Sequence, residues 1–161
     1  MYTSIPSGKI VLPPLLDLMC RLFLATLFLA WAGISNAQVT EMTADMAYEE
    51  LKHDKLILID VRSISEWKTT GIPIGSKPIT IHDRRGIEGF VDQVMKKTNR
   101  DLSKKIAVIC ASGVRSKRAA AALYAAGYRR VINLSEGMLG NALSGSGWIK
   151  KKLPLEKWLG D

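Results

Sequence analysis

The sequence predicts an α/β domain whose central, mostly parallel β-sheet is flanked by helices on both faces. Short, wholly apolar runs at residues 56–59 and 106–109 suit strands buried on both faces, as in parallel sheets. Segments with helical character alternate with these runs, which favours a single α/β domain. The chain has 161 residues and is 47% hydrophobic, so it can bury one compact core.

In the first half of the domain, helices and strands are expected to alternate. Thr43 is a plausible N-cap for a helix over residues 44–52, which is rich in helix-forming residues. The strand at residues 56–59 ends before Asp60. Three further elements are predicted, namely a short helix at residues 65–68, a strand at 79–81 and an amphipathic helix at 87–97.

In the second half, the strand at residues 106–109 runs directly into Cys110 and a glycine-containing loop. An alanine-rich helix is expected over residues 116–126, with Gly127 as the residue that ends it. Another strand follows at residues 130–134. The tail contains several glycines and is predicted to be loop-like.

The N-terminus has the pattern of a secretory signal over residues 1–37. Arg21 precedes an uncharged apolar run at residues 22–34, and small residues follow it. The run is shorter than the roughly 20 residues that a membrane-spanning helix needs. The sequence therefore predicts cleavage after Ala37 and a single domain over residues 38–161.

This interpretation places the protein outside the cytoplasm, in the periplasm if its source is a Gram-negative bacterium. Stable membrane insertion is not expected after cleavage, and an uncleaved N-terminal membrane anchor is the alternative. The leader is long, and Met19 stands just before Cys20 and Arg21. We hypothesise that translation starts at Met19, which would give a signal of ordinary length.

The most informative segment joins the buried strand to the following helix. A residue at this junction lies at the carboxyl end of a strand, where open α/β sheets place their sites. Backbone N–H groups and a helix N-terminus there form an anion-binding cradle, and an arginine adds a guanidinium. These groups favour the thiolate over the thiol, and the thiolate is the nucleophile. The candidate catalytic residue is Cys110, and the candidate substrate-binding residues are Ala111, Ser112, Gly113, Val114, Arg115 and Ser116.

A buried cysteine can also act only as a small hydrophobic residue, which is the structural alternative for Cys110. After signal cleavage the chain has no second cysteine, because Cys20 lies in the leader. An internal disulfide, a zinc site built on several cysteines and dithiol redox chemistry are therefore excluded for the mature chain. We predict neither a metal site nor a cofactor.

The motifs resemble those of the rhodanese family of sulfurtransferases, in its single-domain form. Asp60-Val61-Arg62 with Glu66-Trp67 resembles that family's motif after an early strand, and residues 71–76 resemble its glycine-proline turn. Residues 110–116 match its active-site loop, and residues 136–138 match its motif after a later strand.

The resemblance implies a sulfurtransferase. By it, Cys110 takes the outer sulfur of thiosulfate or a similar small anionic donor, becomes a persulfide, and passes the sulfur to a thiol or cyanide. Covalent two-step catalysis of this kind predicts ping-pong kinetics. Related phosphatase domains place five residues between cysteine and arginine, whereas Cys110 and Arg115 enclose four. The resemblance implies that the shorter loop favours sulfane sulfur.

The sequence departs from the family pattern in the turn, in the cysteine loop and in the tail. The turn has Ile72 where the family usually has histidine, and Ala111 stands where some members carry a basic residue. The segment 140–148 is stretched by small residues, so the rim of the site is expected to differ.

Other residues near the loop have two interpretations each. Asp60 and Arg62 follow a buried strand, so they either brace the active-site region and pair with each other or form an ordinary turn. Ser112 and Ser116 can donate hydrogen bonds into the cradle, but Ser116 is expected to act mainly as a helix N-cap. Lys117 and Arg118 open a helix against the dipole preference, which indicates positive potential near an anion site or a solvated basic face.

The formal charge of +8 does not select a function by itself, but it suits small anionic substrates. Nucleic-acid binding is not predicted, because the basic residues are scattered and no aromatic–basic stacking motif occurs. Two alternatives to the sulfurtransferase stay open. One is a non-catalytic sulfur carrier or protein-binding module of the same fold, and the other is a phosphatase or arsenate reductase.

Overall fold

The computed structural model describes residues 39–160. The predicted signal peptide and the two possible start sites lie outside these residues, so the export prediction stays a prediction. Among the described residues, no helix has both the length and the apolar character needed to cross a membrane.

The core of the domain is a five-stranded sheet with strand order β1-β6-β5-β2-β4, and all its pairings are parallel. Its strands are β1 (Thr40–Met42), β2 (Ile57–Asp60), β4 (Lys77–Pro78), β5 (Lys105–Ile109) and β6 (Arg130–Leu134). A small antiparallel sheet joins β3 (Ile72–Pro73) to β7 (Leu155–Glu156). The prediction of an α/β domain with a mostly parallel central sheet is confirmed.

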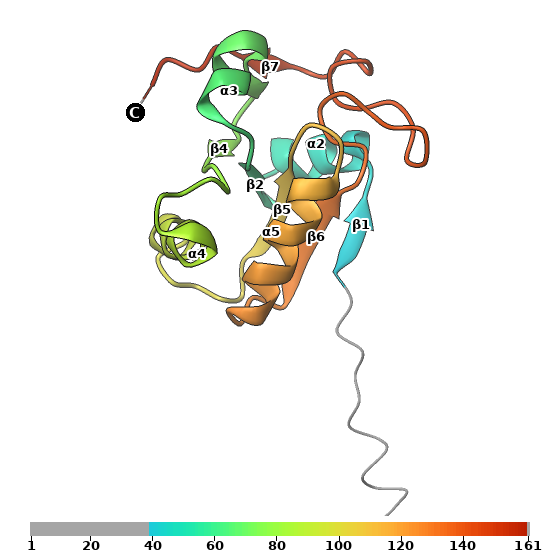
Figure 1. Cartoon of the computed structure of the whole chain (residues 1–161). Helices are drawn as coiled ribbons and strands as arrows, with labels where there is room; N and C mark the ends of the chain where they lie inside the picture. The colour runs from blue at the N-terminus through green and yellow to red at the C-terminus, as the bar shows by residue number, and fades with distance from the viewer. Residues whose placement is uncertain (1–38, 161) are drawn as a thin grey trace, which may run out of the picture. The chain divides into compact units, whose positions relative to one another are not determined.

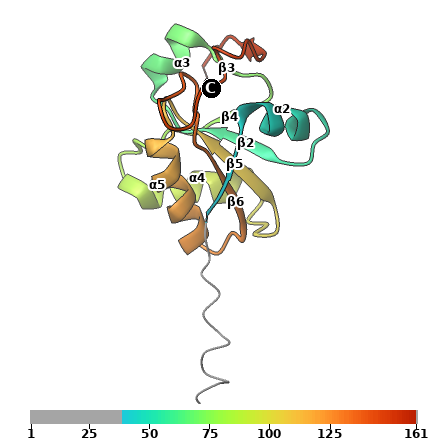
Figure 2. The same cartoon turned by 90° about the vertical axis from the view of Figure 1, so that its right-hand side faces the viewer.

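Helices cover both faces of the sheet, as the sequence predicts. They are α2 (Ala44–Lys52), α3 (Ile64–Thr70), α4 (Gly86–Lys97) and α5 (Val114–Ala125). Figure 2 shows α4 and α5 on one side of the sheet and α2 on the other. Alternate residues of β5 divide between two cores, since Ile106 and Val108 pack with α4 and α5 whereas Ala107 and Ile109 pack with α2.

Local signals place most elements. Thr43 caps α2, and its side chain accepts the Met46 N–H. Gly127 has a φ of +108° just beyond α5, the left-handed conformation that a glycine tolerates best after a helix. These two elements and β6 lie where the sequence predicts them, to within two residues.

The predicted strand at residues 79–81 is wrong, because the strand at this sheet edge is β4, two residues earlier. The backbone stays extended beyond β4, and the N–H groups of Ile79 and Ile81 donate to the carbonyls of Asp60 and Val61 at 3.0 and 3.2 Å. Residues 79–81 therefore mark a segment that runs past the last residue of β2, beyond the last paired residues Asp60 and Pro78.

Three strands, β1, β3 and β7, have no counterpart among the predicted elements, and each is only two or three residues long. β1 forms the sheet edge beside β6, with Glu41 opposite Asn133. Figure 1 shows β1 beside β6 and β7 near α3, and Figure 2 shows β3 near α3. Such short edge strands are decided by tertiary pairing rather than by local sequence.

Candidate active site

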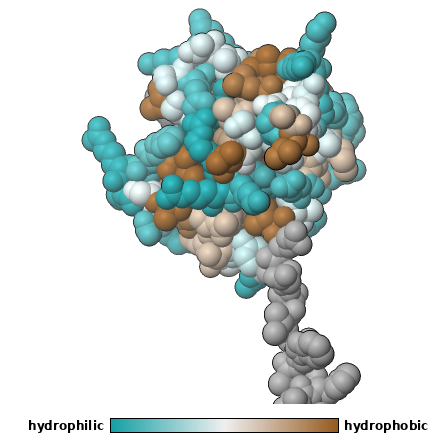
Figure 3. Space-filling view, turned by 45° about the vertical axis from the view of Figure 1, so that its right-hand side comes forward, coloured by the Kyte–Doolittle hydropathy of each residue, from teal (hydrophilic) through white to brown (hydrophobic). Residues whose placement is uncertain are grey.

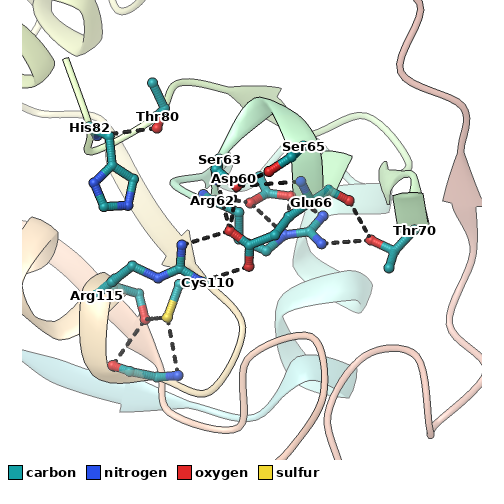
Figure 4. A network of polar contacts seen from close by, with 12 residues as sticks. Asp60, Arg62, Ser63, Ser65, Glu66, Thr70, Thr80, His82, Cys110 and Arg115 are labelled. Carbon is teal, nitrogen blue, oxygen red and sulfur yellow. Dashed lines mark hydrogen bonds and ion pairs between the residues drawn. The ribbon is translucent and has the colours of Figure 1, made fainter. Parts of the chain in front are cut away.

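Cys110 lies at the carboxyl end of β5, and its side chain is 1% exposed. Its Sγ accepts two hydrogen bonds, from the Gly113 N–H at 3.2 Å and from the Ser116 hydroxyl at 3.3 Å. Figure 4 shows both bonds meeting at the sulfur. Donors that converge on one sulfur stabilise negative charge on it, as a nucleophilic thiolate requires.

Gly113 makes the turn from the loop into α5. It is the N-cap of the helix, with a φ of +90°. A Cβ at this position would lie 2.2 Å from the Ser135 carbonyl oxygen, so a larger residue cannot fit without moving the loop. The glycine therefore both adopts the left-handed backbone and lets the loop pack against the end of β6.

The segment after β6 holds the other side of the loop. The N–H groups of Met138 and Leu139 donate to the carbonyls of Cys110 and Ala111 at 2.8 and 2.9 Å. A Cβ at Gly137 would lie 2.5 Å from the Ala111 oxygen, so the two backbones are in direct contact. The family-like motif at residues 136–138 thus acts as a backbone clamp on the cysteine loop.

The remaining predicted loop residues form the wall and rim of the cradle. Ala111 is half-buried and Ser112 is exposed, while the Val114 side chain is 76% exposed. The Asn141 carboxamide donates to the Ser112 carbonyl at 3.1 Å and to the Ser135 carbonyl at 2.8 Å. Asn141 belongs to the glycine-rich tail segment, so this stretched segment does form part of the rim.

The N-cap interpretation of Ser116 is wrong. Ser116 lies inside α5 and is fully buried, and its hydroxyl lies 3.1 Å from the Gly113 carbonyl and 3.3 Å from the Cys110 Sγ. Because α5 begins at Val114 rather than at residue 116, the serine occupies the first helical turn and faces the sulfur. The geometry supports its other interpretation, as a hydrogen-bond donor into the cradle.

The guanidinium of Arg115 is not free to bind an anion in the cradle. Its two terminal nitrogens each lie 2.7 Å from an oxygen of Glu66 on α3, which makes a bidentate ion pair. The Arg115 bonds hold the pKa of Glu66 at about 2, well below its ordinary value of 4.5, and Ser63 contributes to the shift. The same pair raises the pKa of Arg115. Glu66 is therefore a residue of the site that was not among the predicted site residues (Figure 4).

A local signal for Glu66 does exist. Ser63 and Glu66 form a capping box, in which the Ser63 N–H donates to Glu66 at 3.0 Å and the Glu66 N–H lies 3.3 Å from the Ser63 hydroxyl. This motif fixes the start of α3 and the direction of the Glu66 carboxylate. Nothing local, however, indicates that Arg115, 49 residues later in the chain, is its partner.

The Glu66–Arg115 pair is expected to stabilise the fold at neutral pH and to lose this effect in acid. Because the folded-state pKa of Glu66 is lowered, the pair contributes stability above about pH 4.5 and loses it as the pH falls toward 2. The pair is partly exposed, so solvent screening limits its contribution to about 1 kcal/mol. We expect Glu66→Gln to be less stable than wild type by about that amount near pH 6, and equally stable near pH 2.

Urea unfolding measured across this pH range tests the expectation. Glu88→Gln is the matched control, because Glu88 forms no ion pair within residues 39–160. A difference between wild type and Glu66→Gln that stays constant from pH 6 to pH 2 would contradict the assignment.

Asp60 and Arg62 form a fully buried ion pair just after β2. The Arg62 Nη2 lies 2.6 Å from the Asp60 Oδ2, and the Arg62 Nε lies 3.0 Å from both carboxylate oxygens. The guanidinium also donates to the Thr70 hydroxyl and the Gly71 carbonyl, both at 2.7 Å. Arg62 thus connects the end of β2 to the end of α3, the helix that carries Glu66. These contacts support the interpretation that the two residues hold the surroundings of the site in place.

His82 lies on the same side of the molecule as the cysteine loop. Figure 4 shows its imidazole pointing toward Arg115 at the start of α5, and its backbone N–H donates to the Thr80 hydroxyl at 3.1 Å. No role was predicted for it from the sequence. Within residues 39–160, no group of three histidine, cysteine or acidic side chains has the arrangement of a metal site.

The fold and the site define a class of protein, namely a parallel α/β domain with a cysteine at the floor of a loop between a strand and a helix. The profile of the rhodanese-like domain matches residues 43–141, which include the cysteine loop and its clamp. The chain therefore belongs to the rhodanese-like family.

Individual relatives agree with this assignment. An uncharacterised protein of Rickettsia prowazekii is 32% identical over 119 residues, which are 72% of this chain and 96% of that protein. A thiosulfate sulfurtransferase of Glaesserella parasuis is 26% identical over 117 residues, covering 73% of this chain and 93% of that enzyme. The crystal structure of an M. tuberculosis protein has the same fold, with a TM-score of 0.59, 24% identity, and coverage of 74% of this chain and 98% of that one.

Proposed function

We propose that the protein transfers sulfane sulfur from thiosulfate or a similar anionic donor to a thiol or to cyanide, through a persulfide on Cys110. The observation that carries this proposal is the buried Cys110 Sγ with the Gly113 N–H and the Ser116 hydroxyl directed at it. The rhodanese-like family and the sulfurtransferase among its relatives support the same chemistry.

In the first step, the Cys110 thiolate attacks the outer sulfur of thiosulfate. A new sulfur–sulfur bond forms on Cys110, the sulfur–sulfur bond of thiosulfate breaks, and sulfite leaves with the electron pair. In the second step, the acceptor attacks the outer sulfur of the persulfide and forms a new bond to it. The sulfur–sulfur bond to Cys110 breaks, and its electron pair stays on Cys110 as a thiolate. Neither step consumes an external oxidant or reductant.

Arg115 has an indirect part in this chemistry. Its terminal nitrogens are bound to Glu66, so we assign the oxyanion end of the donor to backbone N–H groups of the loop instead. The Glu66–Arg115 pair instead ties the start of α5 to α3 and fixes one wall of the cradle. Arg115 therefore positions the site and does not contact the oxyanion directly, as the loop motif alone would suggest.

The test is the mass of the intact chain after incubation with thiosulfate. We expect one added sulfur atom on wild type and on Cys20→Ser, but none on Cys110→Ser. Cyanide should remove the added sulfur as thiocyanate. Steady-state sulfur transfer should fall at least about 1,000-fold in Cys110→Ser, because the nucleophile is lost.

The other outcomes separate the alternatives. Failure of any sulfane donor to modify Cys110 would overturn the proposal. Hydrolysis of an aryl phosphate without persulfide formation would indicate the phosphatase instead, although the loop of four residues disfavours it. A Cys110 persulfide that forms but is never turned over, or cellular function retained in Cys110→Ser, would indicate the carrier or binding module.

A further inference from the structure

The Glu136 side chain opens the backbone clamp at residues 136–138 and is almost completely buried. It is 5% exposed, and the next residue, Gly137, is in direct contact with the Ala111 carbonyl. A buried carboxylate is costly unless donors and a counter-ion surround it. The partners of Glu136 therefore decide how firmly the clamp is held.

Those partners come from opposite ends of the domain. The Ala44 N–H, at the start of α2, donates to the Glu136 Oε2 at 2.9 Å. The Lys151 ammonium, in the tail, lies 2.9 Å from each carboxylate oxygen of Glu136 and also contacts Asp45. Within residues 39–160, Lys151 is the only counter-ion of Glu136. Without the lysine, these residues would offer the buried carboxylate one N–H donor and no positive charge.

Lys151 differs from the lysines on either side of it. Hydrophilic side chains cover much of the face in Figure 3, where they separate the hydrophobic patches. Lys150 and Lys152 are exposed and form no ion pair among the described residues, whereas the Lys151 side chain is only 20% exposed. Burial by itself lowers the pKa of Lys151, but the bonds to Asp45 and Glu136 outweigh burial and raise this pKa above its ordinary value of 10.5. Lys151 is therefore positively charged at neutral pH.

The clamp connects Glu136 to the reactive sulfur. Two residues beyond Glu136, the Met138 N–H donates to the Cys110 carbonyl at 2.8 Å. The Cys110 backbone sets where its Sγ lies relative to the Gly113 N–H and the Ser116 hydroxyl, which are 3.2 and 3.3 Å from it. A misplacement of about 1 Å in a reacting arrangement can cost about 100-fold in rate. Movement of Glu136 therefore reaches the sulfur through a short stretch of backbone.

We infer that Lys151 is a positioning residue for sulfur transfer. Its ion pair with Glu136 holds the clamp, and the clamp holds Cys110 where the donors of the loop meet the sulfur. Lys151 acts through Glu136 and not on the substrate. The inference rests on the proposed sulfurtransferase function and adds to it a part for the tail.

Single-turnover persulfide formation with thiosulfate tests this role. The full chain with Cys20→Ser is the reference, so that Cys110 is its only thiol. We expect Lys151→Gln to lower the rate constant at saturating thiosulfate about tenfold, because the sulfur is misplaced. The thiosulfate concentration that gives half of this rate should change less than twofold, because the donor is held by other groups. Lys151→Arg keeps the charge and should bring the rate constant back to within about threefold of the reference.

Two matched variants separate positioning from the loss of charge or stability. Lys150→Gln removes the neighbouring exposed charge and should leave the rate constant unchanged. Lys105→Gln breaks the ion pair with Glu50, in which the lysine is 21% exposed, much like Lys151. That pair joins α2 to the end of β5 opposite Cys110. Lys105→Gln should therefore be destabilised to a similar degree in urea unfolding, yet keep its rate constant.

Glu136→Gln tests the other half of the pair, including the case in which Lys151→Gln does not fold. It leaves no buried carboxylate unpaired, and its carboxamide oxygen can still accept the Ala44 N–H. Because the ion pair that holds the clamp is lost, we expect persulfide formation to be slowed at least about threefold.

The results distinguish the two proposals. If no persulfide forms on Cys110 in the reference chain, the sulfurtransferase function fails and the role of Lys151 falls with it. If the reference reacts, only the positioning role is overturned by any of three results. These are unchanged rates in Lys151→Gln or Glu136→Gln, an equal loss of rate in Lys105→Gln, or no recovery in Lys151→Arg.

Discussion

Replacing Arg62 by methionine is expected to lower the free energy of unfolding by about 3–5 kcal/mol. Asp60 is fully buried and Arg62 is 2% exposed, so the substitution leaves a carboxylate in the core without its counter-ion. The contacts from Arg62 to Thr70 and Gly71 are lost as well, which releases the end of α3. Denaturant unfolding followed by circular dichroism measures the change.

The matched control for this prediction removes both charges. In Asp60→Asn/Arg62→Met no buried charge is left unpaired. The new carboxamide oxygen can still accept the backbone N–H of residue 62, which Asp60 accepts at 3.0 Å. We therefore expect the double variant to be more stable than Arg62→Met alone. If Arg62→Met were as stable as the double variant, the unpaired Asp60 carboxylate would carry no cost, and the ion pair would contribute little to stability.

Replacing Gly113 by alanine is expected to slow sulfur transfer about 100-fold or more. The added Cβ would lie 2.2 Å from the Ser135 oxygen, on a backbone whose φ is +90°. The loop must move to relieve this contact, and the Gly113 N–H then leaves its position 3.2 Å from the Cys110 Sγ. Losing one donor that stabilises developing charge typically costs about 10²–10³-fold in rate. Single-turnover persulfide formation with thiosulfate measures the effect.

Gly75→Ala provides the control for backbone strain alone. Gly75 also has a positive φ, +72°, but the nearest atom to an added Cβ is Leu51 Cδ2 at 4.0 Å. Both variants should lose about 1–2 kcal/mol of stability from the left-handed backbone. Only Gly113→Ala should lose the sulfur transfer. Equal activity in the two variants would mean that the tight packing of Gly113 on Ser135 is not needed for the chemistry.

Local patterns were enough to predict the main elements. The helix from residue 44 with Thr43 as its cap, and the strand at residues 130–134, follow from capping and apolar runs within a few residues. Where the outcome depended on a neighbour in space, local patterns failed. Residues 79–81 look like a strand because of Ile79 and Ile81, but the pairing of β4 with β2 ends at Pro78 and Asp60.

The same division holds for the site. The strand–loop–helix order predicts that Cys110 stands at the carboxyl end of a strand, and it does. The prediction for Ser116 failed because α5 begins two residues earlier than its alanine-rich pattern indicates, since Gly113 and not the serine ends the loop. Ser116 therefore does not cap the helix but lies in its first turn, where its hydroxyl contacts the sulfur.

By itself, the sequence determined the fold class, the order of the main elements and the position of the candidate nucleophile, because each depends on residues that are adjacent in the chain. Only the tertiary structure decided that Arg115 is held by Glu66, that Asp60 and Arg62 are buried together, and that Lys151 pairs with Glu136. The physical reason is that these contacts join segments brought together by the packing of the helices on the sheet, and no local periodicity encodes which distant side chains then meet.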